Sequence, residues 1–442
     1  MAAWRILGSG VLALIVCPLA AAQTYPLVET ARAGDCFQVQ IDMTLTGEIR
    51  VNRGGGPISM KRTASAHHQF SERVLAANPE GVVQKAARFY ETAKLTLAVN
   101  DLPTERALRT ERRLLIAQRP KDQLFVYCPT GPLTAEELEL TAEHFDTLAI
   151  VGLLPAKSVA IGDTWKPGNV TVQQLCGFEG LTTHDLQCKL EEVRDHLAKV
   201  TVAGSATGIE LGALAKLKID ASCQFDLATH RITAVEWKQH DDRDQGPASP
   251  ATNIDTVTTV KRSPMEQPQS LSDVALISVP DGFDVPGTMS QLAYHDARNR
   301  YDLIYAREWQ IVAQTDDHVV MRLLDHGDFV AQVTITPWTR ARSGEHMTPE
   351  AFQQAMAGTP GWEQGDVLQV GEVPTEAGRW IYRVSALGKM DGMKLLQNFY
   401  LVASPSGEQV VLAFTMTQAQ AEKLGTRDLS LVGSLDFPPK PK

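Results

Sequence analysis

The sequence predicts an α+β protein in two parts. The first part is a curved antiparallel β-sheet domain, open-barrel or clam-like in shape and carrying helices, and the second is an α/β sandwich. Two long series of alternating apolar and polar residues support this prediction, because a period of two is typical of strands with one buried face. Helix signals interrupt these strands at only a few places. Residues 263–273, which are rich in Pro, Gln and Ser, divide the two series.

The chain has 442 residues, enough for two domains that each bury a core. We expect a signal peptide at 1–22, a curved β-rich domain with central helices at 25–262, a linker at 263–273, a sandwich domain at 274–437 and a tail at 438–442. A net charge of -10 argues against a nucleic-acid partner, because such binding needs a concentrated basic surface. The densest basic cluster, 106–119, also contains Glu111 and is predicted to be a solvated strand face.

The N-terminus has the pattern of a signal peptide. Arg5 gives a basic start, 11–16 is apolar, and 20–22 are small residues, which predicts cleavage near Ala22/Gln23. We therefore expect export to the periplasm or the extracellular space, with membrane contact only through the transient signal peptide. A retained anchor is the alternative, but the apolar stretch is interrupted by Pro18 and is shorter than the about 20 residues of a spanning helix.

Cysteines are confined to the first half of the expected mature chain, at Cys36, Cys128, Cys176, Cys188 and Cys223. An oxidising compartment permits disulfides, and a bond between Cys176 and Cys188 would close a short loop. An odd number requires at least one free thiol or a bond to another molecule, and the pairing stays open. The absence of a CxxC motif argues against a zinc ribbon or a thioredoxin-type site.

The first half begins with a long strand, because 37–45 alternates strictly between apolar and polar residues. The stretch Asn52 to Pro57, with three consecutive glycines, predicts a turn into a strand at 58–75 and therefore an unusually long hairpin. Further strands are predicted at 93–99, 106–118, 123–128, 198–206, 214–226, 231–239 and 254–261.

Helices are expected in the middle of this half. Thr134 and Glu137 match a capping box, and Leu138, Phe145 and Leu148 follow at helical spacing, which predicts a helix on the concave face of the sheet. A second short helix is predicted at 170–176.

Two resemblances concern this half. The phrase VAIGDTW at 159–165, preceded by Leu153-Leu154-Pro155, resembles one in uncharacterised families of exported bacterial proteins, which implies an extracytoplasmic β-rich domain without an assigned activity. A curved sheet with a helix across its mouth also resembles the fold of periplasmic lipoprotein carriers. Lipid carriage would require a large, apolar and incompletely filled concave face. The alternative is that the helix stripe fills that face.

Two candidate metal sites are disfavoured. His67 and His68 are adjacent on a strand and should point to opposite faces. The stretch 240–250, HDDRDQGPASP, lacks the ligand spacing of a calcium loop and is predicted to be a solvated loop.

The second half contains a second series of strands. They are predicted at 301–305, from Trp309, and at 319–324, 329–337, 367–373, 379–387, 396–403 and 409–417. Thr348 should cap a helix that begins at Pro349, and a closing helix is expected at about 418–424, with 429–435 packing behind it.

This order of elements resembles the PsbP-type α/β sandwich. The resemblance covers roughly 290–437 and depends on 301–305 with Trp309, on the turn and strand at 325–331, and on 398–401 before Gly407. The family includes an extrinsic subunit of the plant oxygen-evolving complex and a Ran-binding import factor. It implies a non-enzymatic binding or assembly module and supplies no shared catalytic residues.

The sequence contains no G-x-S-x-G, H-E-x-x-H or P-loop motif, so it assigns no catalytic, cofactor-binding or metal-ligating residue and predicts no cofactor. We expect an exported non-enzymatic binding or structural interaction protein, whose partner is an unidentified protein or an apolar small molecule. The alternative is an extracytoplasmic carrier of a lipid or other apolar ligand, and the third possibility is a hydrolase with an unrecognised site.

Overall fold

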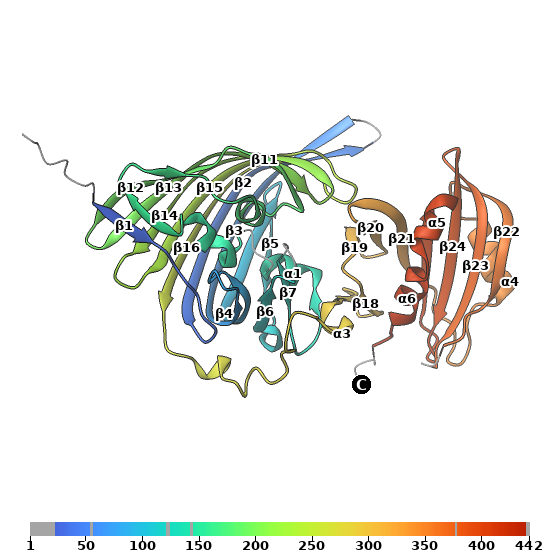
Figure 1. The fold of residues 1–442 in the computed structure, drawn as a ribbon. Helices are drawn as coiled ribbons and strands as arrows, with labels where there is room; N and C mark the ends of the chain where they lie inside the picture. The colour runs from blue at the N-terminus through green and yellow to red at the C-terminus, as the bar shows by residue number, and fades with distance from the viewer. Residues whose placement is uncertain (1–22, 54–55, 121–123, 142–144, 376–377, 439–442) are drawn as a thin grey trace, which may run out of the picture.

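The computed structural model describes residues 23–53, 56–120, 124–141, 145–375 and 378–438 (Figure 1). The predicted signal peptide and the centre of the predicted glycine turn lie outside these ranges. About 55% of the chain is strand and 14% is helix, in large antiparallel sheets. The protein is therefore β-rich, and the predicted α+β class is wrong. Within the described residues, no helix is long and apolar enough to cross a membrane.

The first part forms a 13-stranded sheet. Along the sheet, the order is β10 (Thr164–Trp165), β12 (Gln187–Arg194), β13 (Leu197–Glu210), β14 (Ala213–Asp226), β15 (Arg231–Arg243), β16 (Ala251–Pro264), β2 (Cys36–Arg53), β3 (Gly56–Ala77), β4 (Val83–Val99), β6 (Leu114–Gln118) and β7 (Phe125–Tyr127). In addition, β11 (Gly180–His184) pairs with β13, and β5 (Leu102–Ala107) pairs with β4. Among the described strands, β10 and β7 do not pair with each other, so the sheet is open.

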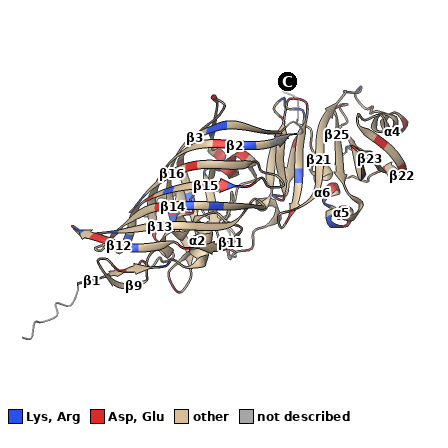
Figure 2. Cartoon of the chain, turned by 90° about the horizontal axis from the view of Figure 1, so that it is seen from above, with Lys and Arg blue, Asp and Glu red and all other residues tan. Residues whose placement is uncertain are grey.

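The long hairpin of β2 and β3 confirms the sequence prediction. Its antiparallel register runs from Cys36 opposite Arg73 to Arg53 opposite Gly56. The apolar side chains at odd positions 37–45 are buried, because they lie on the concave face of the curved sheet. The convex face is polar except on β4, β6 and β7, where residues 265–290 cover an apolar cluster, and Figure 2 shows charged residues of both signs spread along its strands. Each buried apolar side chain contributes about 1.5–3 kcal/mol to stability, which fixes the register of these strands.

Short helices lie on the concave face. They are α1 (Ala135–Thr141), the 3-10 helix η2 (Thr147–Leu153) and α2 (Asn169–Leu175). The predicted capping box is confirmed, since Glu137 N donates to Thr134 Oγ1 at 3.1 Å and Thr134 N donates to Glu137 Oε2 at 3.0 Å. The predicted apolar stripe does not belong to one helix, however, because α1 ends at Thr141 and Leu148 lies in η2.

Basic residues attach these helices to the sheet, so the predicted solvated face at 106–119 is wrong. Arg109 Nε donates to Glu137 Oε1 at 2.6 Å, and Arg119, only 3% exposed, forms an ion pair with Asp146. The stretch 106–118 is also not one strand. It divides into β5, the 3-10 helix η1 (Thr110–Arg112) and β6. Basic residues that alternate with apolar ones have the pattern of a half-exposed strand, which explains the wrong prediction. Their burial is possible because carboxylates of residues 136–146 pair with them.

The second part contains a seven-stranded antiparallel sheet. The order is β19 (Trp309–Gln314), β20 (Val319–Asp325), β21 (Asp328–Trp338), β25 (Gln409–Met416), β24 (Met393–Ala403), β23 (Trp380–Met390) and β22 (Trp362–Glu372). The strands β24 and β25 lie in the middle of this order. The helix α4 (Pro349–Ala357) begins at the predicted Thr348 cap, with Ala351 N donating to Thr348 Oγ1 at 3.3 Å. The helix α5 (Gln418–Leu424) lies at the predicted position, and the segment behind it, for which no helix was predicted, forms α6 (Arg427–Ser434).

The helices are too short for an α/β sandwich, which explains why that prediction fails. The helix α4 has 9 residues and packs on one face, whereas α5 with 7 and α6 with 8 residues lie on the other (Figure 1). Seven strands span roughly 29 Å, whereas a helix with its side chains is about 10–12 Å wide. Part of the sheet therefore stays uncovered, and on β22 Val367, Leu368 and Val370 are 46–56% exposed.

A small sheet and one long segment join the two parts. The strands β17 (Leu292–His295) and β18 (Asp302–Tyr305) pair with each other, and β17 pairs in parallel with β8 (Leu133–Thr134) of the first part. The predicted strand at 301–305 is therefore confirmed but does not join the seven-stranded sheet. Segment 265–290 crosses the convex face of the first part, where Lys85 Nζ donates to the carbonyls of Pro280 and Gly282, each at 2.6 Å.

The five cysteines of the described chain are free and buried, so the possible Cys176–Cys188 bond is not formed. Burial raises the pKa of Cys176, Cys188 and Cys223 to about 12 each, which disfavours the reactive thiolate. We expect iodoacetamide at pH 8 to leave these three thiols of the native protein unmodified.

The intact mass of the alkylated, unfolded protein gives the total number of free thiols. Alkylation under denaturing, non-reducing conditions should add five adducts if the chain begins at Gln23 and six if Cys17 is retained. Fewer than five would mean that the thiols form disulfides in the natural protein.

Candidate functional site

A groove lies on the concave face near the ends of β2, β3, β15 and β16, and we call it the concave groove. It contains about 340 Å³ of free space. Its charged lining residues are Arg62, Glu139, Asp146, Glu210, Asp241 and Arg243, and its apolar ones include Leu45, Phe145, Leu175 and Ile254. Ligand pockets usually hold about 300–1,000 Å³, so the groove is large enough for a small molecule.

Strand register brings these residues together from distant parts of the sequence. Arg62 on β3 lies opposite Gly47 on β2, Gly47 lies opposite Ile254 on β16, and Ile254 lies opposite Asp241 on β15. Adjacent strands are about 4.8 Å apart, so this row spans roughly 14 Å across the floor of the groove. Arg243 lies two residues beyond Asp241 on the same strand and therefore shares its face.

Gly47 is required in this row because β2 and β16 approach each other closely there. A Cβ at Gly47 would lie 2.2 Å from the carbonyl oxygen of Asn253 and 2.8 Å from Ile254 Cα. We expect Gly47→Ala to lower the free energy of unfolding by about 1–3 kcal/mol, the usual cost of overpacking. Urea denaturation monitored by tryptophan fluorescence measures this change. Gly180→Ala is the control, because a Cβ there meets no atom within 4 Å, and equal losses in both variants would contradict the explanation.

The charges of the groove are partly paired. Arg243 Nη1 donates to Glu210 Oε1 at 2.6 Å, and Arg62 Nη2 lies 3.6 Å from Glu139 Oε1. Burial lowers the pKa of Arg62 and raises that of Glu210, in both cases against the attraction of the partner charge. These directions describe a site that is poorly hydrated, where electrostatic interactions are stronger than in water.

Asp241 has the most strongly shifted carboxyl group of the groove. Its Oδ1 is buried and has no hydrogen-bond partner among the described residues. Burial, followed by the negative charge of Glu210, raises its pKa to about 7, although Arg243 acts in the opposite direction. Asp241 therefore exchanges its proton near neutral pH, which makes it a candidate hydrogen-bond donor or acceptor for a bound molecule.

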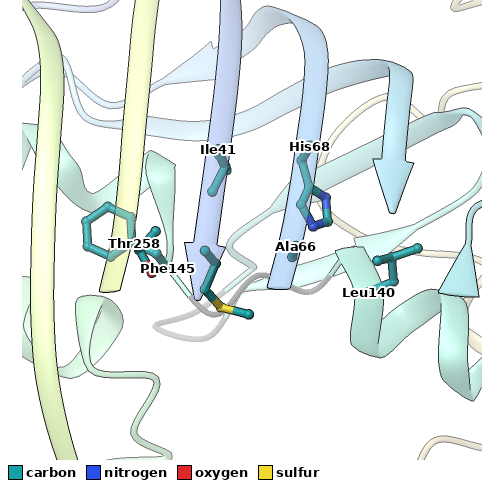
Figure 3. A pocket seen from close by; sticks show the side chains of 7 residues that line it. Ile41, Ala66, His68, Leu140, Phe145 and Thr258 are labelled. Carbon is teal, nitrogen blue, oxygen red and sulfur yellow. The ribbon is translucent and has the colours of Figure 1, made fainter. Parts of the chain in front are cut away.

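An apolar pocket adjoins the groove through Phe145, which lines both (Figure 3). The side chains of Ile41, Met43, Ala66 and Leu140 surround it, and its free space is about 20 Å³. That volume holds about one water molecule. The helical segments therefore largely fill this part of the concave face, as the alternative to a large lipid cavity predicts.

The sequence predicted no site residues. It did consider His67 and His68 as a metal site and disfavoured them, and the structure now shows where both side chains lie. His67 and His68 point to opposite faces as expected, with His67 Nδ1 2.7 Å from Asp42 Oδ1 and His68 in the apolar pocket. The described residues contain no group of His, Cys, Asp and Glu that could hold a metal ion.

The predicted solvated loop at 240–250 is wrong in its first part. Residues 240–243 continue β15, and Arg243 is only 7% exposed. A strand was indicated here by the period of two, because every second position continues the inward face of β15: Trp237, Gln239, Asp241 and Arg243. The prediction missed this strand because the last three of these residues are polar.

Cys176 also lines the groove and is its candidate nucleophile. Its side chain is 7% exposed, and burial raises the pKa of its thiol to about 12. A reactive cysteine needs the opposite shift, so Cys176 is best explained as a packed apolar residue.

No protein-family model and no curated protein matches the chain. Among solved structures, cyanobacterial PsbP from Synechocystis is 12% identical with a TM-score of 0.26, and covers 35% of this chain and 98% of its own. The Ran-binding protein Mog1p of Saccharomyces cerevisiae is also 12% identical with a TM-score of 0.26, over 33% of this chain and 95% of its own. Lipovitellin is 9% identical with a TM-score of 0.30, over 54% of this chain and 26% of its own.

The first two matches amount to a weak PsbP-like resemblance and do not concern the resemblance expected for the N-terminal half. All three TM-scores lie below 0.5, and none of these likenesses tells what the chain binds or does.

Proposed function

We propose that this chain is an exported binding protein and that its concave groove holds a small amphipathic molecule. One observation carries the proposal: about 340 Å³ of free space is lined both by apolar side chains and by charged ones, among them the half-buried Arg62 and Asp241 and the buried Arg243. Buried charges with incomplete hydrogen bonding are costly unless a ligand or water completes their partners. The apolar lining around Phe145 would accommodate the other end of such a ligand.

Native and denaturing mass spectrometry of the full-length gene product, recovered from the exported fraction, tests this proposal. We expect a native mass that exceeds the mass of the polypeptide by a few hundred daltons, with the excess lost on denaturation. A denatured mass that begins at Gln23 would support export with signal cleavage. A chain without any bound small molecule, even after incubation with a detergent-solubilised lipid extract, would contradict the binding role.

Two neighbouring residues of β16 provide a matched pair of variants. Thr256 lines the groove, whereas Val257 points to the convex face and is 37% exposed. Thr256→Phe should fill the groove and abolish the mass excess. Val257→Phe adds a phenyl ring on the opposite face and should leave the excess unchanged. Loss in both variants, or in neither, would place the ligand elsewhere.

A further inference from the structure

We infer that the concave groove selects amphiphiles with an anionic head, either a carboxylate or a phosphate, and that Arg62 and Arg243 hold this head. The inference rests on the binding role proposed above and adds the chemical class of the ligand.

Both arginines of the groove keep a buried N–H donor that no acceptor among the described residues satisfies. Each guanidinium offers five N–H donors in a planar fork that matches a carboxylate or a phosphate. Arg243, 7% exposed, makes one side-chain hydrogen bond, to Glu210, and Arg62 has one ion pair, to Glu139 at 3.6 Å. Among the described residues, the buried Nε atoms of both arginines have no hydrogen-bond acceptor. An anionic head between them would supply the missing acceptors.

The carboxylates of the groove leave little to attract a cationic head. Glu210 accepts from Arg243, and Glu139 Oε2 accepts from Arg106 Nη1 at 2.5 Å. Asp146 forms an ion pair with Arg119, and Asp241 is the remaining acidic group of the lining, whose pKa, raised to about 7, leaves it partly protonated at neutral pH. In that neutral form Asp241 can donate a hydrogen bond to an anion beside Arg243, which lies two residues along the same strand.

The apolar part of such a ligand would lie along the apolar lining of the groove, away from its charged end. Phe145 connects the charged end of the groove to the pocket around Ile41 and Met43, and Leu45 and Ile254 line the floor between them. An alkyl chain along this floor would bury apolar surface at about 25 cal/mol per Å². The pocket itself holds only about one water molecule, so the chain has to lie within the 340 Å³ of the groove, which favours a single alkyl chain.

Isothermal titration calorimetry of the full-length protein with three C12 probes tests the head group. We expect dodecanoate and dodecyl phosphate to bind at least 10-fold more tightly than dodecyltrimethylammonium, all measured below their micelle concentrations. Inorganic phosphate is the fourth probe. It should bind at least 10-fold more weakly than dodecyl phosphate, because it lacks the alkyl chain.

Arginine variants test the residues. Arg62→Gln should weaken dodecanoate binding about 10-fold or more, the usual effect of losing a charge-assisted hydrogen bond. Arg50→Gln is the matched control. Arg50 also has an Nε without a hydrogen bond, but its side chain lies on the convex face beside Asp242, at 3.6 Å. The double variant Arg243→Gln/Glu210→Gln removes the second arginine without leaving an unpaired buried charge, and should have the same effect as Arg62→Gln.

The outcomes separate this inference from the proposed function. If all three C12 probes bind equally, or if the trimethylammonium probe binds most tightly, the anion preference is overturned and the binding role stands. If Arg62→Gln and Arg50→Gln weaken dodecanoate equally, the arginines do not hold the head. If no C12 probe binds, the binding role of the groove itself fails. If inorganic phosphate binds as tightly as dodecyl phosphate, the groove recognises a free anion and the amphipathic ligand is overturned.

Discussion

Arg88→Leu should be among the most destabilising single substitutions in this chain, with a loss of about 3–5 kcal/mol. Arg88 is fully buried, and its Nε donates to Glu72 Oε2 at 2.9 Å, while Glu72 is itself 3% exposed. Leucine would leave the Glu72 carboxylate buried without its cation. It would also remove the hydrogen bond from Arg88 Nη2 to Thr147 Oγ1, at 2.7 Å, which holds η2 against the sheet. Urea denaturation followed by far-ultraviolet circular dichroism measures the loss.

Two controls identify the cause. The double variant Arg88→Leu/Glu72→Leu should recover most of the lost stability, because it removes both charges and keeps apolar volume in the core. Lys189→Leu breaks an exposed pair on the convex face, in which Lys189 lies 3.0 Å from Glu191, and should change stability by no more than about 0.5 kcal/mol. If the double variant is as unstable as Arg88→Leu alone, the loss comes from packing around η2 and not from the unpaired carboxylate.

Most strands could be predicted from the sequence because their signal is local. The alternation at 37–45 and at 214–226 determines which face of each strand is buried, and the glycine-rich turn at 52–57 predicts that β2 returns as β3. Local signals do not give the lengths, and β3 extends over 22 residues from Gly56 to Ala77. The predicted class was wrong for this reason: the strands are longer and the helices shorter than the sequence indicates.

The concave groove could not be predicted, because its residues meet only through register. Arg62, Asp241 and Arg243 lie on strands that are far apart in the sequence, and each is flanked by polar residues that suggest a solvated segment. The capping box at Thr134 predicted α1, but nothing in the sequence indicated that Glu139 on this helix faces Arg62. Buried charged residues are the exception to hydrophobic patterning, and functional sites concentrate such exceptions.

Asp241→Asn should make the protein more stable at pH 8 and leave it nearly unchanged at pH 4. Burial and the charge of Glu210 raise the pKa of Asp241 to about 7 in the folded protein, whereas the ordinary value is 3.8. Between these values the folded state holds the proton and the unfolded state releases it, so stability falls as pH rises from about 4 to about 7. Above pH 7 the full cost applies, up to about 4 kcal/mol, and asparagine avoids it.

Urea denaturation of the wild type and the variant at pH 4, 6 and 8 measures this effect, with a gain of about 2 kcal/mol or more expected at pH 8. Asp242→Asn changes the next residue, which is exposed on the convex face and contributes less than burial and Glu210 to the raised pKa of Asp241, so its gain at pH 8 should be much smaller. If Asp241→Asn is instead less stable by the same amount at every pH, then Asp241 is ionised throughout and is stabilised by Arg243. An ionised Asp241 would repel an anionic head, so this measurement also tests the electrostatic basis of the ligand class inferred for the groove.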